Sequence, residues 1–276
     1  MILDAPHVRK TGDSTFCPKK LEGKVAIVTG GASGIGKATS RHFANHGPIA
    51  VVIADVQDEK GSEVALSIGS HRCTLIKCDV TDELRVQSAV ESTVKIYGRV
   101  DIMFSNAGIG SMCEQGILDF DLGAYEKLVK STAKANAQGT AACGKHAPRA
   151  MVDGGVKGSI VCTASVMATW VSTNVDYTMS KHAVLGLARS PSRGLSNSGI
   201  RVNCVSPAAV ATPHLCRMFG ASPEEFEKLF EPFVYLEKCG ALNGEHVADA
   251  VLFLASDGSQ FITGQNLVID GGNRPH

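Results

Sequence analysis

The sequence predicts an α/β protein built on a single doubly wound parallel sheet with helices on both faces. From residue 21 onward, short runs rich in β-branched residues alternate with longer stretches of helical periodicity. This alternation is typical of right-handed crossover units, which place helices on both faces of a parallel sheet. The chain has 276 residues, 44% of them hydrophobic, which suffices for one continuous core. Because no repeat or linker divides it, residues 21–276 are expected to form one domain after a polar, poorly ordered tail at 1–20.

Seven strands are expected, and each is a short apolar run. They lie at residues 24–28, 50–54, 74–77, 100–104, 159–163, 201–205 and 266–269. Amphipathic stretches such as 83–97 and 123–135 lie between them and are expected to be helices. The segment 212–240 breaks this rhythm, since it is helical in pattern and unusually apolar. Its place near the carboxyl ends of the last strands predicts a helical lid over a ligand, although core or oligomer packing would explain its apolar residues equally well.

Composition argues against several classes of partner. Lys plus Arg and Asp plus Glu both number 27, with neither sign in long runs, so a nucleic-acid or acidic-membrane surface has no support. A small, uncharged metabolite is the expected partner. No apolar run approaches the ~20 residues of a membrane span. The first 20 residues lack the apolar stretch of a secretory signal and contain Asp4 and Asp13, which counts against a transit peptide, so we expect a cytoplasmic protein.

The nine cysteines predict neither disulfides nor a metal site. Their number is odd, no Cys-x-x-Cys pair occurs, and the nine histidines lack metal-ligand spacing. Cys162 and Cys204 stand inside apolar runs, where cysteine is expected to be a small buried hydrophobic residue of a reducing compartment.

A glycine-rich turn follows the first expected strand. Its residues are Thr-Gly-Gly-Ala-Ser-Gly-Ile-Gly at 29–36, and a helix can begin directly after them. Glycines here permit a tight turn and a close approach of the backbone to a pyrophosphate, which the free N–H groups at a helix start would bind. The turn therefore predicts a dinucleotide site that includes Gly30, Ser33, Gly34, Ile35 and Gly36.

Asp55 indicates which dinucleotide is bound. It ends the second expected strand, 19 residues beyond Gly36. A carboxylate at this place can accept hydrogen bonds from the adenosine ribose hydroxyls and would repel a 2′-phosphate, so NAD is expected rather than NADP. Lys37 and Arg41 are nearby in the sequence and would weaken that preference.

Polar residues also follow the third and fourth strands. Asp79 and Val80 come where an adenine would lie, and Asn106, Ala107 and Gly108 follow the next strand in the same way. Asp, Asn and Gly also favour plain turns, so their position at strand ends is what makes these residues candidate cofactor contacts.

Tyr177 and Lys181 form a candidate acid/base pair. They are four residues apart in a stretch with helical spacing of apolar residues, so their side chains share one helix face. Tyrosine titrates near ~10, and a neighbouring ammonium favours the phenolate, so we expect a lowered pKa for Tyr177. By itself this spacing is common on any helix surface. Ser165, just after the expected strand 159–163, adds a hydroxyl at the edge of the sheet where ligands bind in such folds.

Together these motifs resemble the short-chain dehydrogenase/reductase family. The resemblance rests on the glycine turn, Asn-Ala-Gly at 106–108, a serine before Tyr-x-x-x-Lys, Arg-Val-Asn-Cys-Val-Ser-Pro at 201–207 and the closing Gly-Gln-Asn-Leu-Val-Ile-Asp-Gly-Gly at 264–272. It covers about residues 21–272. In the sequence of its motifs, the chain is similar to plant secoisolariciresinol, isopiperitenol and borneol dehydrogenases and to nepetalactol-related short-chain proteins.

The resemblance implies a role for each matching residue. Tyr177 would be the general acid/base, Lys181 would bind the nicotinamide ribose and tune the tyrosine, and Ser165 would bind the reacting oxygen. Asn136 would hold a water for proton relay. The residues that would surround the nicotinamide carboxamide are Pro207, Val210 and Thr212. Family members are usually homotetramers, so the resemblance implies a homotetramer as well.

Three departures from the family pattern concern the pocket. The usual Pro-Gly is Pro207-Ala208, the loop 166–176 is shorter than in the plant relatives, and Pro191 falls inside the expected helix after Lys181. Proline at that place is expected to kink the helix or to end its first part early. None of the three departures removes a catalytic group.

Two enzyme functions follow from these residues. The first is an NAD-dependent oxidoreductase that interconverts a secondary alcohol and a ketone, or a lactol and a lactone, of a bulky apolar plant metabolite such as a terpenoid or lignan. The second is a non-redox cyclase or isomerase on the same scaffold, with a terpenoid dialdehyde or enol substrate, that keeps NAD bound. The first function is the leading hypothesis, and the altered pocket gives indirect support to the second. The complete set of Asn136, Ser165, Tyr177 and Lys181 argues against a binding protein without turnover.

Overall fold

The computed structural model describes residues 19–111, 118, 121–170, 174–236 and 240–273. Seven parallel strands form one sheet in the order β3-β2-β1-β4-β5-β6-β7. The strands are β1 Val25–Thr29, β2 Ala50–Asp55, β3 Cys73–Lys77, β4 Ile102–Ser105, β5 Ser159–Thr163, β6 Arg201–Pro207 and β7 Asn266–Ile269. The predicted doubly wound parallel sheet is thus confirmed. The strand order reverses between β1 and β4, and in such sheets a crevice opens at that point, at the carboxyl ends of the strands.

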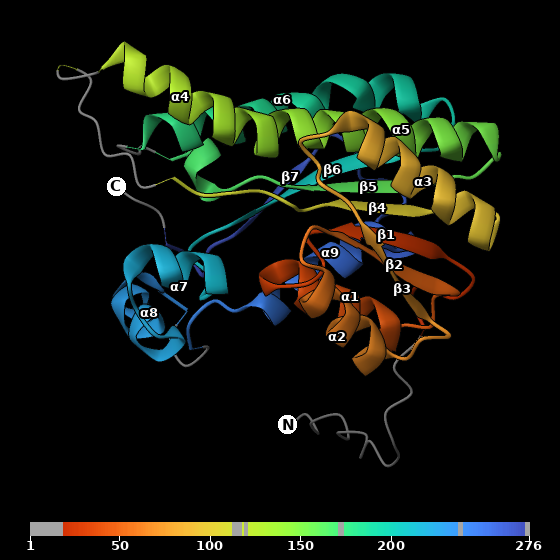
Figure 1. Cartoon of the computed structure of the whole chain (residues 1–276), viewed down its shortest axis with the longest axis horizontal. Coiled ribbons are helices and arrows are strands. Elements are labelled where there is room, and N and C mark those ends of the chain that lie inside the picture. Colours follow the sequence, from red (N-terminus) through yellow and green to blue (C-terminus); the bar gives the residue numbers. More distant parts are fainter. Residues whose placement is uncertain (1–18, 112–117, 119–120, 171–173, 237–239, 274–276) are drawn as a thin grey trace, which may run out of the picture.

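Helices cover both faces of the sheet (Figure 1). On one face lie α3 Glu83–Tyr97, α4 Leu122–Thr132, α5 Gly139–Asp153 and α6 Val175–Ser196. On the other face lie α1 Gly34–Asn45, α2 Asp58–Ile68 and α9 Gly244–Ala255. Two buried apolar clusters correspond to these two layers, one under α3, α5 and α6 and the other under α1, α2 and α9. Cys162 and Cys204 are opposite each other on β5 and β6 and belong to the first cluster, which confirms their expected burial.

Two helices differ from the sequence expectations. The stretch expected as one helix at 123–135 continues without a break from α4 through a π-helical turn, η2 Ala133–Gln138, into α5. The helix α6 runs past Pro191 to Ser196, so of the two expected effects of the proline the early end is wrong, and the kink stays a prediction. A proline removes its own hydrogen bond to the preceding turn and crowds the carbonyl four residues before it. Helix α6 tolerates this because it has 22 residues and packs against β6 and η2, which stabilises it.

The apolar segment expected to be a lid forms two short helices and a turn. These are α7 Pro213–Phe219, α8 Pro223–Phe230 and a 3₁₀ turn, η4 Glu231–Phe233. Among the described residues of this segment the last helical one is Phe233, and residues 237–239 lie outside the described part of the chain. Phe219 and Phe226 pack edge to face with ring centroids 5.3 Å apart, which joins α7 to α8. In Figure 1 the two helices stand apart from both helical layers. That they act as a lid stays a prediction.

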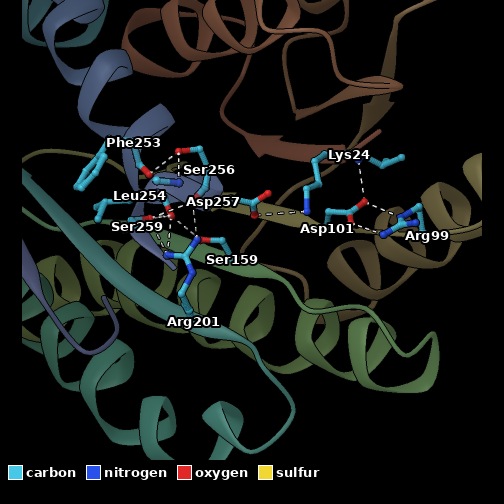
Figure 2. Close-up of polar contacts among 12 residues, drawn as sticks. Lys24, Arg99, Asp101, Ser159, Arg201, Phe253, Leu254, Ser256, Asp257 and Ser259 are labelled. Carbon is cyan, nitrogen blue, oxygen red and sulfur yellow. Dashed lines mark hydrogen bonds and ion pairs between the residues drawn. The ribbon is translucent and has the colours of Figure 1, made fainter. Parts of the chain in front are cut away.

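The amino ends of the strands carry a polar network remote from the crevice (Figure 2). Arg201, at the start of β6, donates to the carbonyls of Leu254 and Ser256 at 2.8 and 3.1 Å and to Ser259 Oγ at 2.9 Å. These carbonyls end α9, so the guanidinium caps the negative end of that helix. Nearby, Asp101 is 2% exposed and accepts from the backbone N–H of β1 and from a neighbouring arginine, which ties β4 to β1.

Two kinds of feature are absent from the described residues. None of their helices is long and apolar enough to cross a membrane. No cluster of three or more His, Cys, Asp or Glu side chains in the same part of the chain could hold a metal ion. Of the predicted N-terminal tail, residues 1–18 lie outside the described residues.

Candidate active site

A cavity of about 650 Å³ opens at the carboxyl ends of the strands. Its walls include the residues that end or directly follow β1 to β6, and α7 and α8 contribute to its outer side. This is the crevice that the reversal of strand order between β1 and β4 predicts.

The glycine turn shapes one end of the cavity. Gly30 and Gly34 have φ values of 67° and 52°, a region that glycine adopts without strain. At Gly36 a Cβ would overlap the carbonyl of Gly30, so no side chain fits there. The Ser33 side chain makes no capping hydrogen bond, which leaves the first N–H groups of α1 without a side-chain partner. Gly30, Ser33, Gly34 and Ile35 line the cavity, whereas Gly36 lies outside its lining.

Asp55 stands at the end of β2 with its carboxylate held by the backbone. Oδ2 accepts from the N–H of Ala32 and Oδ1 from the N–H of Gln57, both at 2.9 Å. The residue is 4% exposed and lines the cavity. Lys37 and Arg41, which would weaken a preference for NAD, are not among the lining residues.

The candidates after β3 and β4 also line the cavity, and they include Asp79, Val80, Asn106, Ala107 and Gly108. Asp79 accepts from a backbone N–H two residues on, at 2.9 Å, so it closes a turn as well. The Asn106 amide donates to the Thr29 carbonyl at 3.1 Å, and its oxygen accepts from Thr163 Oγ1 at 3.1 Å. Asn106 therefore fastens the ends of β1, β4 and β5 to one another.

Ser165, Tyr177 and Lys181 all line the cavity. Ser165 follows β5 and caps a short turn by accepting from the Met167 N–H at 3.2 Å. Tyr177 and Lys181 come from successive turns of α6, and Lys181 Nζ lies 5.7 Å from the centroid of the Tyr177 ring. Lys181 Nζ also donates to the carbonyl of Thr163 at 2.8 Å, which fixes the ammonium at the end of β5.

Burial sets the proton affinities of this pair. It raises the pKa of Tyr177, and a hydrogen bond with Ser165 opposes the rise only in part. The expected lowering of the Tyr177 pKa is therefore wrong. Burial also lowers the pKa of Lys181 from 10.5 to about 8, because an ammonium enclosed in protein loses its hydration.

Asn136 occupies the π-helical turn, but its side chain faces the protein rather than the cavity. Its Oδ1 accepts from the N–H of Ile109 at 2.9 Å, and its Nδ2 donates to the carbonyl of Ile109 and to Ser180 Oγ at 3.0 and 2.9 Å. Both ends of the amide are thus used in holding the chain after β4. The cavity is lined by the neighbouring Ala135 and not by Asn136, so the predicted water relay has no support from this side chain.

The residues after β6 complete the wall as expected. Pro207, Val210 and Thr212 all line the cavity, as does Ala208, which replaces the usual glycine. Thr212 Oγ1 accepts from the N–H of Leu215 at 3.3 Å and so caps α7.

Several lining residues were missed from the sequence. They are Ile109, Gly110, Ser111, Met167, Asn174, His214 and Arg217. The first three directly continue the Asn-Ala-Gly motif, so the length of the loop after β4 was a usable signal. His214 and Arg217 lie in the apolar segment 212–240, whose predicted role rested on its hydrophobic residues alone.

Comparison with known proteins finds relatives that match nearly the whole chain. A family model described as enoyl-(acyl carrier protein) reductase matches residues 30–274. A (+)-cis,trans-nepetalactol synthase of Nepeta racemosa is 53% identical, over 92% of this chain and 94% of its own. The (−)-isopiperitenol/(−)-carveol dehydrogenase of Mentha piperita is 51% identical, over 92% and 94%. It is described as mitochondrial, so a cytoplasmic location for this chain stays a prediction.

Solved structures agree with this assignment. A carveol dehydrogenase from Mycobacterium avium, in complex with NAD, matches with a TM-score of 0.82 at 28% identity, over 92% of this chain and 98% of its own. A short-chain type dehydrogenase/reductase from Mycobacterium marinum matches with a TM-score of 0.81 at 31% identity, over 92% and 97%. The resemblance that the motifs carried is thereby confirmed, and the chain belongs to the short-chain dehydrogenase/reductase family.

Proposed function

We propose that this protein is an NAD-dependent dehydrogenase that interconverts a secondary alcohol and a ketone, or a lactol and a lactone, of a bulky apolar terpenoid or lignan. The observation that carries the proposal is the convergence of Ser165, Tyr177 and Lys181 on one cavity with the glycine turn and Asp55. Relatives named for carveol and isopiperitenol, one of them solved with NAD, support the terpenoid class and the cofactor.

The residues at the nucleotide end fit NAD. Because residue 36 is a glycine, no side chain covers the backbone of Gly30. Helix α1 begins without a side-chain cap, so a pyrophosphate can approach its free N–H groups. The Asp55 carboxylate is held at the cavity wall by two backbone N–H groups, where it suits a ribose diol and disfavours a phosphate.

The chain's own residues would handle the proton of the reaction. NAD, when bound, accepts the hydride that the alcohol carbon gives up. Tyr177 takes the proton of the alcohol hydroxyl in oxidation and returns it in reduction, while the Ser165 hydroxyl donates to the same oxygen. The Lys181 ammonium, 5.7 Å from the phenol ring, favours the phenolate that oxidation requires.

The test combines two readouts on one set of substrates. The protein is incubated with NAD and with carveol, isopiperitenol or nepetalactol, while the absorbance of reduced nicotinamide and the identity of the product are followed together. Tyr177→Phe should lower turnover by about 10²–10⁴-fold with little change in NAD affinity, because only the proton-transferring hydroxyl is lost. Tyr97→Phe is the matched control, because Tyr97 lies at the end of α3 and is not one of the cavity-lining residues. Its phenol pairs instead with Thr74 Oγ1 of β3 at 2.6 Å. Full turnover in Tyr177→Phe would refute the assigned role.

A non-redox cyclase is the second candidate, and the 53% identity to a nepetalactol synthase favours it. In that case the same cavity would close an enol or dialdehyde into a ring while NAD stays unchanged. Nepetalactol formed from its open-chain precursor without a rise in reduced nicotinamide would select this function over the dehydrogenase. The homotetramer that the family resemblance implies stays a prediction, which light scattering of the purified protein would test.

A further inference from the structure

The three residues after Gly108 form a rim of the cavity that side chains from several elements hold in place. We call residues 109–111 the rim segment. Asn136 binds both the N–H and the carbonyl of Ile109, as described above. Asn174, directly before α6, donates to the carbonyl of Ser111. The rim segment is therefore fixed at both of its ends.

His214 ties α7 to the middle of this rim segment. Gly110 donates its N–H to His214 Nε2 at 2.9 Å, a contact between residues 104 positions apart. A Cβ on Gly110 would stand 3.0 Å from Met218 Sδ and 3.3 Å from His214 Nε2, so glycine lets α7 approach this closely. His214, Gly110 and Met218 all line the cavity. The bond thus sets the distance between two of its walls.

The same bond decides which ring nitrogen of His214 carries the proton. A backbone N–H can only donate, so Nε2 is the acceptor, and the proton of the neutral ring is on Nδ1. Burial, and then the charge of Arg217, lower the pKa of His214, so the ring is neutral at pH 7. No described residue accepts a hydrogen bond from Nδ1 of His214. This nitrogen is also not among the unpaired side-chain atoms that are buried away from solvent. His214 therefore presents a free donor.

The cavity wall around this donor is largely apolar. Helices α7 and α8 contribute Leu215, Met218, Phe226 and Phe230 to it, and Arg217 is the one charged lining residue on these two helices. The reacting oxygen of a substrate is already assigned to Ser165 and Tyr177. A donor among apolar side chains disfavours a bound molecule that leaves it unpaired and favours one with an oxygen at that place.

We propose that His214 determines specificity by donating from Nδ1 to a second oxygen of the substrate, remote from the carbon that is oxidised. This inference rests on the proposed function and narrows it. The substrate class becomes a terpenoid or lignan alcohol that carries a further hydroxyl, carbonyl or ether oxygen.

Two substitutions separate the two ring nitrogens. In His214→Gln the amide oxygen falls close to the Nε2 position, so the acceptor for Gly110 is kept and the donor at the Nδ1 position is lost. In His214→Asn the amide nitrogen falls close to the Nδ1 position, so the donor is kept and the tie to Gly110 is lost. The two variants are matched controls for each other.

The probes are carveol and the diol formed by adding water across its side-chain double bond. They share the ring and the reacting alcohol and differ by one remote hydroxyl. With wild-type protein and NAD we expect kcat/KM to favour the diol by about tenfold, the range of one hydrogen bond to a neutral group. His214→Asn should keep this ratio while KM rises for both alcohols, and His214→Gln should bring the ratio close to one.

Binding is measured in parallel, by titrating each alcohol into the complex of the protein with reduced NAD and following the nicotinamide fluorescence. If neither alcohol is oxidised, the proposed dehydrogenase function fails, and the binding ratio still decides the role of His214. Equal binding of the two alcohols to the wild type, or a preference that His214→Gln retains, would overturn the inference. So would a nitrogen NMR spectrum that places the ring proton of His214 on Nε2.

Discussion

Lys181→Met should stabilise the cofactor-free protein while it abolishes catalysis. Lys181 is 5% exposed, and burial lowers its pKa from 10.5 to about 8. At about 1.36 kcal/mol per pKa unit, the ionised lysine is about 3 kcal/mol less stable in the folded protein than in the unfolded chain. Methionine has similar length and no charge, so it removes this penalty. The Thr163 carbonyl loses its 2.8 Å donor, which costs about 1 kcal/mol, and the net gain is about 2 kcal/mol at pH 7.

This gain should depend on pH in a defined direction. Below about pH 8, the lysine is ionised in both states and the wild type bears the full penalty. Between about pH 8 and pH 10.5 the unfolded chain binds more protons than the folded protein, so the wild-type free energy of unfolding rises with pH. Above pH 10.5 the lysine is neutral in both states. The advantage of the variant should therefore shrink across this window.

Urea unfolding of both proteins, at pH 7 and at about pH 10, measures the effect. Lys77→Met is the control, because the Lys77 side chain is 72% exposed and its replacement should change the free energy of unfolding by no more than about 0.5 kcal/mol. A Lys181→Met protein that is less stable than the wild type at pH 7 would refute the reasoning. An advantage of the same size at both pH values would refute it as well.

Three shorter predictions address other parts of the molecule. Because burial raises the pKa of Tyr177, alcohol oxidation needs a minor phenolate form of this residue. The kcat/KM for oxidation should therefore increase with pH, by up to about tenfold per pH unit, and a flat pH profile would contradict this. Gly36→Ala should weaken NAD binding at least about tenfold by calorimetry, because the new Cβ displaces the Gly30 carbonyl, and unchanged affinity would count against pyrophosphate binding at the glycine turn. Arg201→Met should lower the free energy of unfolding, measured in urea, by about 2–3 kcal/mol, because it removes the cap of α9. It should leave the affinity for NAD unchanged, and a loss of affinity would mean that the two ends of the sheet are coupled.

The sheet could be predicted from the sequence because each strand carries its own signals. Most of the apolar β-branched runs are followed closely by glycine, aspartate or asparagine, and these features are local. Helix α6 shows where local signals fail, since packing against β6 and η2 maintains a helix through Pro191. The π-helical turn η2 likewise depends on contacts of Asn136 with a loop 27 residues away. The sequence pattern does not reveal such long-range contacts.

The residues of the site, too, could be predicted where the signal is local and could not where it depends on the folded chain. Residues that directly follow strands were found because parallel strands end at one edge, which brings Asp55, Asn106 and Ser165 to one cavity. The direction of the Tyr177 pKa was wrong because it depends on burial, which neither spacing nor residue type reveals. His214 was missed for the same reason, because only the folded chain brings it to Gly110.

The partners of Lys181 explain why its proton affinity lies so close to neutral pH. Beneath α6, Cys162 and Cys204 face each other on neighbouring strands, and their charges would raise the pKa of Lys181. A hydrogen bond with Cys204 that favours the neutral thiol, and then burial, hold the pKa of Cys162 well above its usual value, so that thiol stays uncharged and supports the ammonium only weakly. A carboxylate in the same place would pair with the ammonium and keep it protonated far into the alkaline range. Because the sheet offers thiols instead, burial dominates, and Lys181 can exchange its proton near pH 8 beside the tyrosine that needs it.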